Sequence, residues 1–514
     1  MEPFLVVCLA GVIFTLSWTV LSRQRKAPLP PGPKAKPIIG NLADLPPPGA
    51  QEWIHWARHK YLYGRISSVT VLGQTLIILN DSRYAFELLE KRSAQHSSRP
   101  KMMFGGEMVG WEDSLVMQPY GDRLRAYRRN AGKVLGSSTR ISRFHDLQDI
   151  EVRRFLFRVL KSPGDLQQHI RTEAGAIILK ITYDYTINPH GNDPLVDLAD
   201  EAVAQFGLAT VPGVWMVDIM PFWTKFKQTA RSWRKALDDV AQKPYSYVKQ
   251  QMKLGNYKPS FVSELLQKEK LSSEEDFVNK WSAMSLYTGG ADTTVSSIAC
   301  FFLAMTLFPE VQRKAQEEID RVIGSTRLPG SDDRPNLPYI NAVVKEVLRW
   351  HPVAPMGVAH MTTEEDVFEG YHIPKGAYIM PNIWAFFHDP ETYPDPETFR
   401  PERFLSLNGH MPEPDPYTMV FGFGRRICPG RYLADSAIFL TIVKSLAAFN
   451  MSKLVENGKE VEPVVEFQNG VISHPVPFKI NVKPRSADYE TLIRSVESDH
   501  PWEEGNASAL EGIV

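Results

Sequence analysis

The stretch Phe421-Gly-Phe-Gly-Arg-Arg-Ile-Cys-Pro-Gly430 places one cysteine in a glycine-rich turn, directly before a helical pattern. Pro429 suits the first turn of a helix, and residues 431–446 carry apolar side chains at three- and four-residue spacing. Cys428 is therefore expected at a helix N-terminus, where free N–H groups stabilise a thiolate. A cysteine alone is more often a small buried apolar residue. In this setting it is a candidate iron ligand.

The neighbours of the cysteine suit a large planar cofactor. Gly422 and Gly424 allow a tight turn that lies flat against a ring, and Gly430 keeps the start of the helix close to it. Phe421 can shield the sulfur from water, and Arg426 can pair with a carboxylate of the cofactor. These positions predict a haem whose iron is bound by the cysteine sulfur and whose propionate groups are bound by the protein.

The pattern Phe-x-x-Gly-x-Arg-x-Cys-x-Gly resembles the haem-binding signature of the cytochrome P-450 family. The resemblance implies a mainly α fold with a small β subdomain, haem b (iron protoporphyrin), and Cys428 as the axial thiolate ligand. It also implies a monooxygenase, an oxidoreductase that acts on paired donors and incorporates molecular oxygen. Periodicity points the same way, because helical patterns dominate and residues 66–71, 75–79 and 378–381 have the composition of short strands.

A second motif, Gly289-Gly-Ala-Asp-Thr-Thr294, also fits the start of a helix capped by Asp292 or Thr293. Apolar residues nevertheless follow a helical spacing on both sides of it, which predicts one long helix. The Thr293 hydroxyl is expected to bond the carbonyl four residues back and distort a turn. The motif resembles the family's Ala/Gly-Gly-x-Asp/Glu-Thr-Thr/Ser. By that resemblance, Thr293 would hydrogen-bond the bound dioxygen and Asp292 would help to supply protons.

Three further residues match a structural network of the family. Glu346 and Arg349 lie three residues apart on one helical face, a spacing that is common in surface ion pairs. Arg403, in Phe399-Arg-Pro-Glu-Arg-Phe404, resembles the third member of the family's buried Glu-Arg-Arg network. We expect this network to support the haem loop and to take no part in catalysis.

Candidate partners for the haem propionates are Arg426, Arg128 and His360. Here the sequence departs from the family pattern, because Leu124 stands where a Trp is usual and Met361 follows the histidine in place of a frequent Arg. The arginines between residues 123 and 129 suit either a docking face for an acidic electron donor or an ordinary solvated surface.

Composition excludes several classes of protein. The chain has 514 residues, of which 43% are hydrophobic and 23% charged, with a net charge of −1, which gives no support to nucleic-acid binding. Its three cysteines, Cys8, Cys300 and Cys428, are too few and too scattered for a disulfide framework or a zinc site.

The N-terminal segment predicts a membrane location. Residues 4–21 carry no charge and are followed by Arg23, Arg25 and Lys26, so residues 1–22 are expected to form one transmembrane helix. A cleaved signal peptide is disfavoured by the position of these basic residues. The prediction is a single-pass protein of the endoplasmic reticulum whose catalytic domain faces the cytosol.

Three further segments follow the anchor. Residues 23–50 form a basic and Pro-rich linker, and residues 51–485 a single catalytic domain of the P-450 type. Residues 486–514 form an acidic tail, which we expect to be loosely ordered.

The electrons must come from a partner, because no glycine-rich dinucleotide fingerprint follows a strand. Resemblance implies O2 and NADPH-derived electrons from a separate NADPH-cytochrome P-450 reductase. Two rival functions are a reductase-independent isomerase or dehydratase and a non-catalytic haem-binding protein. The pair Asp292 and Thr293 argues against both, because its role by resemblance is to protonate oxygen.

The substrate is expected to be a hydrophobic small molecule. By resemblance, the segments that line its pocket are residues 102–111, 206–215, 284–292, 353–357 and 470–473, which are mostly apolar. Other stretches, including His351-Pro-Val-Ala-Pro355, resemble fungal microsomal members that modify secondary metabolites, among them the O-methylsterigmatocystin oxidoreductase-like group. This placement suggests oxidation of a polyketide or aromatic metabolite.

Overall fold

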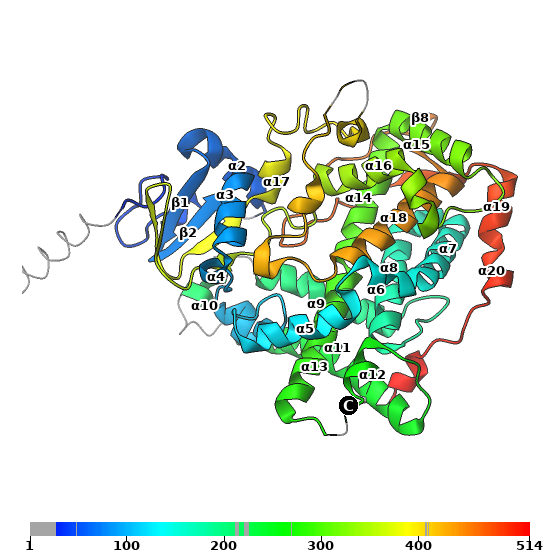
Figure 1. Cartoon of the computed structure of the whole chain (residues 1–514), viewed down its shortest axis with the longest axis horizontal. Coiled ribbons are helices and arrows are strands. Elements are labelled where there is room, and N and C mark those ends of the chain that lie inside the picture. Colours follow the sequence, from blue (N-terminus) through cyan, green and yellow to red (C-terminus); the bar gives the residue numbers. More distant parts are fainter. Residues whose placement is uncertain are drawn as a thin grey trace, which may run out of the picture.

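Helices form most of the chain, which confirms the predicted mainly α fold with small sheets (Figure 1). The computed structural model describes residues 27–47, 49–210, 215–219, 226–268, 270–406, 409 and 411–513. The predicted membrane anchor, residues 1–22, and the first residues of the linker lie outside the described residues.

Helix α14 (Thr293–Leu307) lies at the centre of the body, and nearly all of its residues are buried. Helices α8 (Leu166–Tyr183), α16 (Pro338–Trp350) and α18 (Arg431–Ala448) pack against it. A helix that is apolar on every side needs such neighbours to cover it. Together with α13 (Ser273–Ala291) it makes a rod, residues 273–307, that is the only described helix long and apolar enough to cross a membrane; 78% of its most apolar window is buried inside the protein.

The other main helices surround this rod (Figure 1). They are α5 (Asp122–Leu135), α7 (His145–Lys161), α9 (Pro194–Ala209), α11 (Lys227–Leu254) and α15 (Pro309–Val322), whereas α2 (Glu52–Tyr63) packs against the strand Ile66–Val71. Helix α7 packs against α8 and α18, while α5 and α11 pack against α13.

A four-stranded sheet forms the small β subdomain, with the order β1-β2-β6-β3. Strands β1 (Ile66–Val71) and β2 (Gln74–Leu79) make an antiparallel hairpin, β6 (Tyr378–Pro381) runs parallel to β2, and β3 (His360–Met361) is antiparallel to β6. The predicted strands are thus confirmed. Two small sheets complete the β structure: β4 (Asp366–Phe368) with β5 (Tyr371–Ile373), and β8 (Lys459–Val461) with β7 (Phe449–Glu456) and β9 (Ile480–Pro484).

The prediction of a loosely ordered tail is wrong. Ser486 caps helix α19 (Ala487–Arg494) through the N–H of Tyr489, and a short helix α20 (Val496–Asp499) follows. Tyr489, Ile493 and Val496 are buried in the same core cluster as residues of α7 and α18. Their spacing of four and three residues is a helical stripe, whereas the acidic residues Asp488, Glu497 and Asp499 are exposed.

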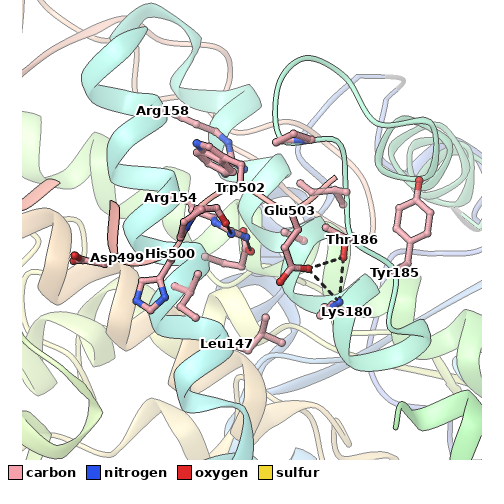
Figure 2. Close-up of a pocket in the computed structure, with 16 residues that line it drawn as sticks. Leu147, Arg154, Arg158, Lys180, Tyr185, Thr186, Asp499, His500, Trp502 and Glu503 are labelled. Carbon is pink, nitrogen blue, oxygen red and sulfur yellow. Dashed lines mark hydrogen bonds and ion pairs between the residues drawn. The ribbon is translucent and has the colours of Figure 1, made fainter. Parts of the chain in front are cut away.

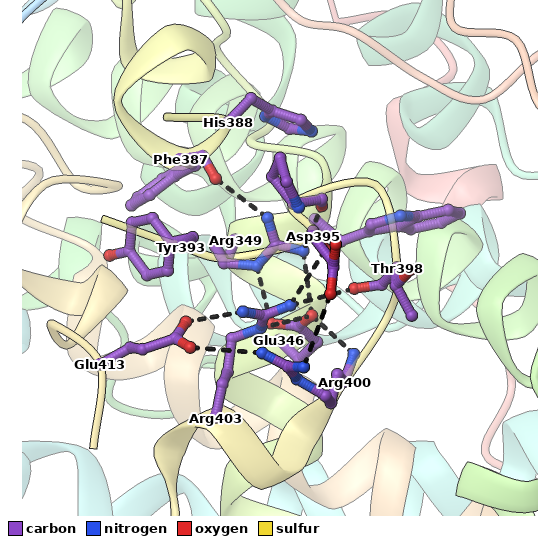
Figure 3. Close-up of polar contacts among 12 residues, drawn as sticks. Glu346, Arg349, Phe387, His388, Tyr393, Asp395, Thr398, Arg400, Arg403 and Glu413 are labelled. Atoms are coloured by element: carbon purple, nitrogen blue, oxygen red, sulfur yellow. Dashed lines mark hydrogen bonds and ion pairs between the residues drawn. The ribbon is translucent and has the colours of Figure 1, made fainter. Parts of the chain in front are cut away.

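The predicted buried network is present and has a fourth member (Figure 3). Glu346 accepts hydrogen bonds from Arg349 Nε at 2.7 Å and from Arg403 Nε at 3.1 Å, and all three side chains are fully buried. Arg403 also donates to Glu413 at 2.6 Å. Arg349 donates to the carbonyl of Phe387 at 3.0 Å. The network therefore fixes α16 to the loops that follow β6.

Replacing Glu346 by Gln should lower the free energy of unfolding by about 3–5 kcal/mol, because two buried guanidinium groups lose their shared carboxylate. The measurement is a urea titration of the haem-loaded protein. Glu310→Gln is the matched control, since Glu310 pairs with Arg313 on the exposed face of α15 and should change the midpoint very little. Equal shifts for both variants would contradict the structural role of the network.

Candidate active site

A cavity of about 370 Å³ lies between α8, α14, α18 and the cysteine loop. Its walls are mostly apolar, and they include parts of all five predicted segments: Trp111, Phe206, residues 284–290 in part, residues 353–357 in part, and Val471 with Ile472. Other parts of the predicted lining do not face it. Phe104 instead stacks on Trp215 with the ring centres 3.5 Å apart.

The cysteine loop is held in shape by its backbone. The Cys428 N–H donates to the Phe421 carbonyl at 2.8 Å, and Gly422 and Gly424 adopt positive φ angles of 78° and 51°. A Cβ on Gly424 would lie 2.4 Å from the Leu89 carbonyl oxygen. This close approach requires glycine, as the turn prediction assumed.

Cys428 and Phe421 both line the cavity, and Gly430 directly precedes α18. Burial raises the pKa of the Cys428 thiol, whereas the N–H groups of Gly430 and Arg431 and the charge of Arg128 lower it. The helix N-terminus thus supplies donors to the sulfur, as the sequence predicts. This donor set suits a sulfur that binds a metal as the thiolate.

The predicted propionate partners Arg426, Arg128 and His360 come together on the cavity wall, and they are joined by Arg99. No ion pair links any of the three arginines to a carboxylate in the part of the chain that the structure describes. Burial and the charge of Arg128 lower the pKa of Arg426 to about 9. Burial and Arg426 also hold the pKa of Arg99 well below its usual range.

These arginines are anchored to main-chain carbonyls, which fixes their direction. Arg426 donates to Ser97 at 2.6 Å and Gln118 at 2.5 Å, while its third guanidinium nitrogen is buried with no partner among the described residues. Arg99 donates to the carbonyl of Val358 at 2.7 Å, and Arg128 to that of Ile427 at 2.9 Å. Clustered buried cations need anions, so the two propionates of a haem fit this wall.

His360 fits a propionate less simply. Its Nδ1 lies 2.7 Å from the His96 carbonyl and must donate to it. Burial and the charge of Arg99 lower the pKa of His360. In the neutral ring the other nitrogen is an acceptor, so only a protonated His360 can donate to a carboxylate.

The distorted turn between α13 and α14 confirms the predicted geometry. Thr293 lines the cavity, and its hydroxyl donates to the Gly289 carbonyl at 2.7 Å. Asp292 leaves the helical backbone region, with φ −122° and ψ −36°. Its carboxylate lies 3.0 Å from His474 Nε2 and does not line the cavity. The structure therefore orients the acid of the motif toward the loop that contains His474.

Arg99 and His474 are the site residues that the sequence does not reveal. Arg99 stands alone before a proline, far along the chain from the cysteine loop, and His474 lies in a segment without helical or strand periodicity. Each acquires its position only through contacts between distant segments. No local pattern marks either residue.

A thiol at a helix N-terminus, facing an apolar cavity edged by unpaired cations, defines a haem-thiolate protein. A family model described as "Cytochrome P-450" matches residues 30–482, and the chain belongs to this family. It is 50% identical to cytochrome P-450 monooxygenase ppsD of Aspergillus oryzae, over 98% of each chain.

Other relatives agree with this assignment. Cytochrome P-450 monooxygenase claR of Ampulloclitocybe clavipes is 49% identical, over 93% of this chain and 90% of the relative. O-methylsterigmatocystin oxidoreductase of Aspergillus flavus is 42% identical, over 99% and 98%. The resemblance stated from sequence is confirmed, and the chain is an oxidoreductase of the monooxygenase class.

Replacing Arg99 by Leu should accelerate the loss of haem to an excess of apomyoglobin by about tenfold or more, because a charge-assisted hydrogen bond contributes roughly 1.5–3 kcal/mol. Arg125→Leu is the control, since Arg125 is an exposed residue of α5 that forms an ion pair with Asp122. Loss of haem at the wild-type rate from the Arg99 variant would contradict its assignment to a propionate.

Proposed function

We propose that this protein is a haem-thiolate monooxygenase of fungal secondary metabolism that oxidises a hydrophobic small molecule, using O2 and electrons that originate from NADPH. The observation that carries the proposal is the Cys428 sulfur at the floor of an apolar cavity, close to a group of arginines without carboxylate partners. Membership of the family and the names of the relatives support the same chemistry.

The residues of the site have distinct proposed roles. Cys428 would bind the iron, Phe421 would shield the sulfur, and Arg99, Arg128, Arg426 and His360 would hold the propionates. When bound, haem supplies the activation of oxygen. Thr293 presents its hydroxyl to the cavity and would hold a proton near the reacting oxygen.

Asp292 would take part in proton supply through its neighbour. Its carboxylate is bonded to His474, which fixes its direction. If the hydrogen bond to His474 breaks, the Asp292 carboxylate can exchange a proton with water beside Thr293.

The substrate is proposed to be a polyketide or aromatic metabolite. Away from the arginine group, the cavity wall is dominated by apolar groups such as Trp111, Phe206 and Ile178, and its hydroxyl groups include Ser114, Ser285 and Thr288. Such a lining suits a flat, apolar molecule with a small number of oxygen atoms. A relative that covers nearly the whole chain is named an O-methylsterigmatocystin oxidoreductase.

The electron donor is proposed to be a separate NADPH-cytochrome P-450 reductase in the same membrane. The uncharged run in residues 4–21, with its basic flank, supports an uncleaved anchor in the endoplasmic reticulum and a cytosolic catalytic domain. The rival functions, an isomerase or dehydratase that needs no reductase and a haem-binding protein without turnover, leave the Thr293 hydroxyl in the cavity without a role.

The assignment of Cys428 predicts a spectroscopic loss. Cys428→Ser should abolish the red-shifted carbon monoxide band of the reduced thiolate haem, because a serine oxygen cannot replace the electron-rich sulfur. Cys300→Ala is the control; Cys300 is buried within α14, and this variant should keep the band. Persistence of the band in the Cys428 variant would refute the assignment.

The reaction can be tested by reconstituting membranes with a reductase, NADPH and a panel of aromatic metabolites. Mass spectrometry of the products would then detect a gain of oxygen or a loss of hydrogen.

Thr293→Ala should bind haem normally but divert electrons to peroxide, so that the amount of product formed per NADPH falls by about tenfold or more. Thr293→Ser, which keeps the hydroxyl, is the matched control. An unchanged product yield in the alanine variant would contradict the proton-holding role, and turnover without reductase would favour the rival isomerase.

A further inference from the structure

A second cavity, of about 280 Å³, lies between α7, α8 and the C-terminal tail (Figure 2). Trp502 covers it, with the guanidinium groups of Arg154 and Arg158 at 4.8 and 5.2 Å from its ring centres. Arg154 also donates to the Pro501 carbonyl at 3.3 Å. Residues 499–503 of the tail therefore form one wall of this cavity.

Buried polar groups on α7 face the second cavity. Glu151, Arg154 and Arg158 are spaced by three and four residues and line it from one helical face. One Glu151 oxygen accepts from Arg154 at 2.7 Å. The other Glu151 oxygen, Arg154 Nε and a terminal nitrogen of Arg158 are buried without a partner among the described residues. Buried polar atoms of this kind normally bond to water.

Helix α8 is the wall between the two cavities. Ala176 and Lys180 line the small cavity, whereas Ala174 and Ile177 line the large one. Glu173 lies three residues before Ala176, on the same helical stripe, yet it lines the large cavity. Its side chain therefore stands where the two cavities approach each other.

Glu173 is a buried acid with one free oxygen. It is 1% exposed, one oxygen accepts from the Thr441 hydroxyl at 2.5 Å, and the other has no partner among the described residues. Burial raises the pKa of Glu173 to about 8, although the Thr441 hydrogen bond and the charge of Arg158 lower it. The group is therefore protonated at neutral pH and can give up a proton near physiological conditions.

Arg158 lies between the two acids. Its charge acts on both Glu151 and Glu173, but it forms no ion pair or hydrogen bond with either of them in the described part of the chain. Buried polar groups that face each other across a gap are commonly bridged by water.

We propose that Glu151, Arg158 and Glu173 line a hydrated passage between the two cavities, that Glu173 passes protons through it into the large cavity, and that Trp502 closes its outer end. In each transfer Glu173 releases a proton to water in the large cavity and regains one from water on the Arg158 side, so no co-reactant is needed. The passage would serve the proton demand of a monooxygenase whatever molecule it oxidises, and it is separate from the Thr293 and Asp292 pair.

Infrared spectroscopy of the haem-loaded protein tests the proposal without substrate. The wild type should show a protonated carboxyl band, and Glu173→Gln should remove this band. The control is Glu318→Gln, which should leave the band unchanged. Glu318 is a buried acid that accepts hydrogen bonds from the N–H groups of Tyr339 and Ile340. On transfer to D2O the band should shift faster in Trp502→Ala, by roughly tenfold, because exchange follows access to the buried group. Trp502→Phe, which keeps a ring over the arginines, should exchange close to the wild-type rate.

Arg158→Met should slow the exchange, because it replaces a polar wall by an apolar one. Absence of a band assigned to Glu173, or an exchange rate that neither Trp502→Ala nor Arg158→Met alters, would overturn the proposal. A high-resolution crystal structure of the wild-type holoenzyme provides a second test that needs no variant. Ordered water bonded to both Glu173 and Arg158 supports the passage, and a dry gap between them refutes it.

Discussion

The thiolate proposed at Cys428 constrains the whole of the site. A thiolate inside a protein requires compensation from donors that are already in place, since water cannot reorganise around it. Here the compensation comes from the first N–H groups of α18 and from Arg128, which approaches from α5 and bonds the Ile427 carbonyl. The orientation of two helices is therefore tied to the electrostatics of Cys428.

Holding these donors in place around the sulfur also constrains the cysteine loop, residues 421–430, and the scaffold that it packs against. The loop can lie so close to the backbone at Leu89 only because Gly424 has no side chain. Elsewhere in the scaffold, Glu346 and its two arginines hold the segments after α16 through fully buried ion pairs. Buried ion networks contribute little net stability but define geometry well. In this protein the network ties Glu346 and Arg349 of α16 to Phe387, Arg403 and Glu413.

Local strings in the sequence were sufficient to predict the parts of the site that depend on neighbouring residues. The helix start after Cys428, the hydroxyl bond of Thr293 and the hairpin at residues 66–79 all arise from contacts within a few residues, so periodicity and glycine placement predict them. Arg99 and His474 could not be predicted, because each is positioned by segments distant in sequence. Glu413 could not be predicted for the same reason.

The error in the tail has a different cause. Its acidic composition suggested disorder, but three apolar residues at helical spacing, Tyr489, Ile493 and Val496, are enough to dock it on α7. Average composition therefore conceals a short stripe that local periodicity would have shown.

The docked tail also bears on how the chain folds during synthesis. Residues 487–510 are synthesised long after α7 and α8, yet they cover both helices and pair with Thr186 through Asn506. Apolar and cationic surface on α7 and α8 must therefore stay uncovered until the tail has been translated, a period in which exposed surface favours aggregation. Removal of residues 487–510 would leave the segment matched by the family model, residues 30–482, complete in sequence but with α7 uncovered on one side.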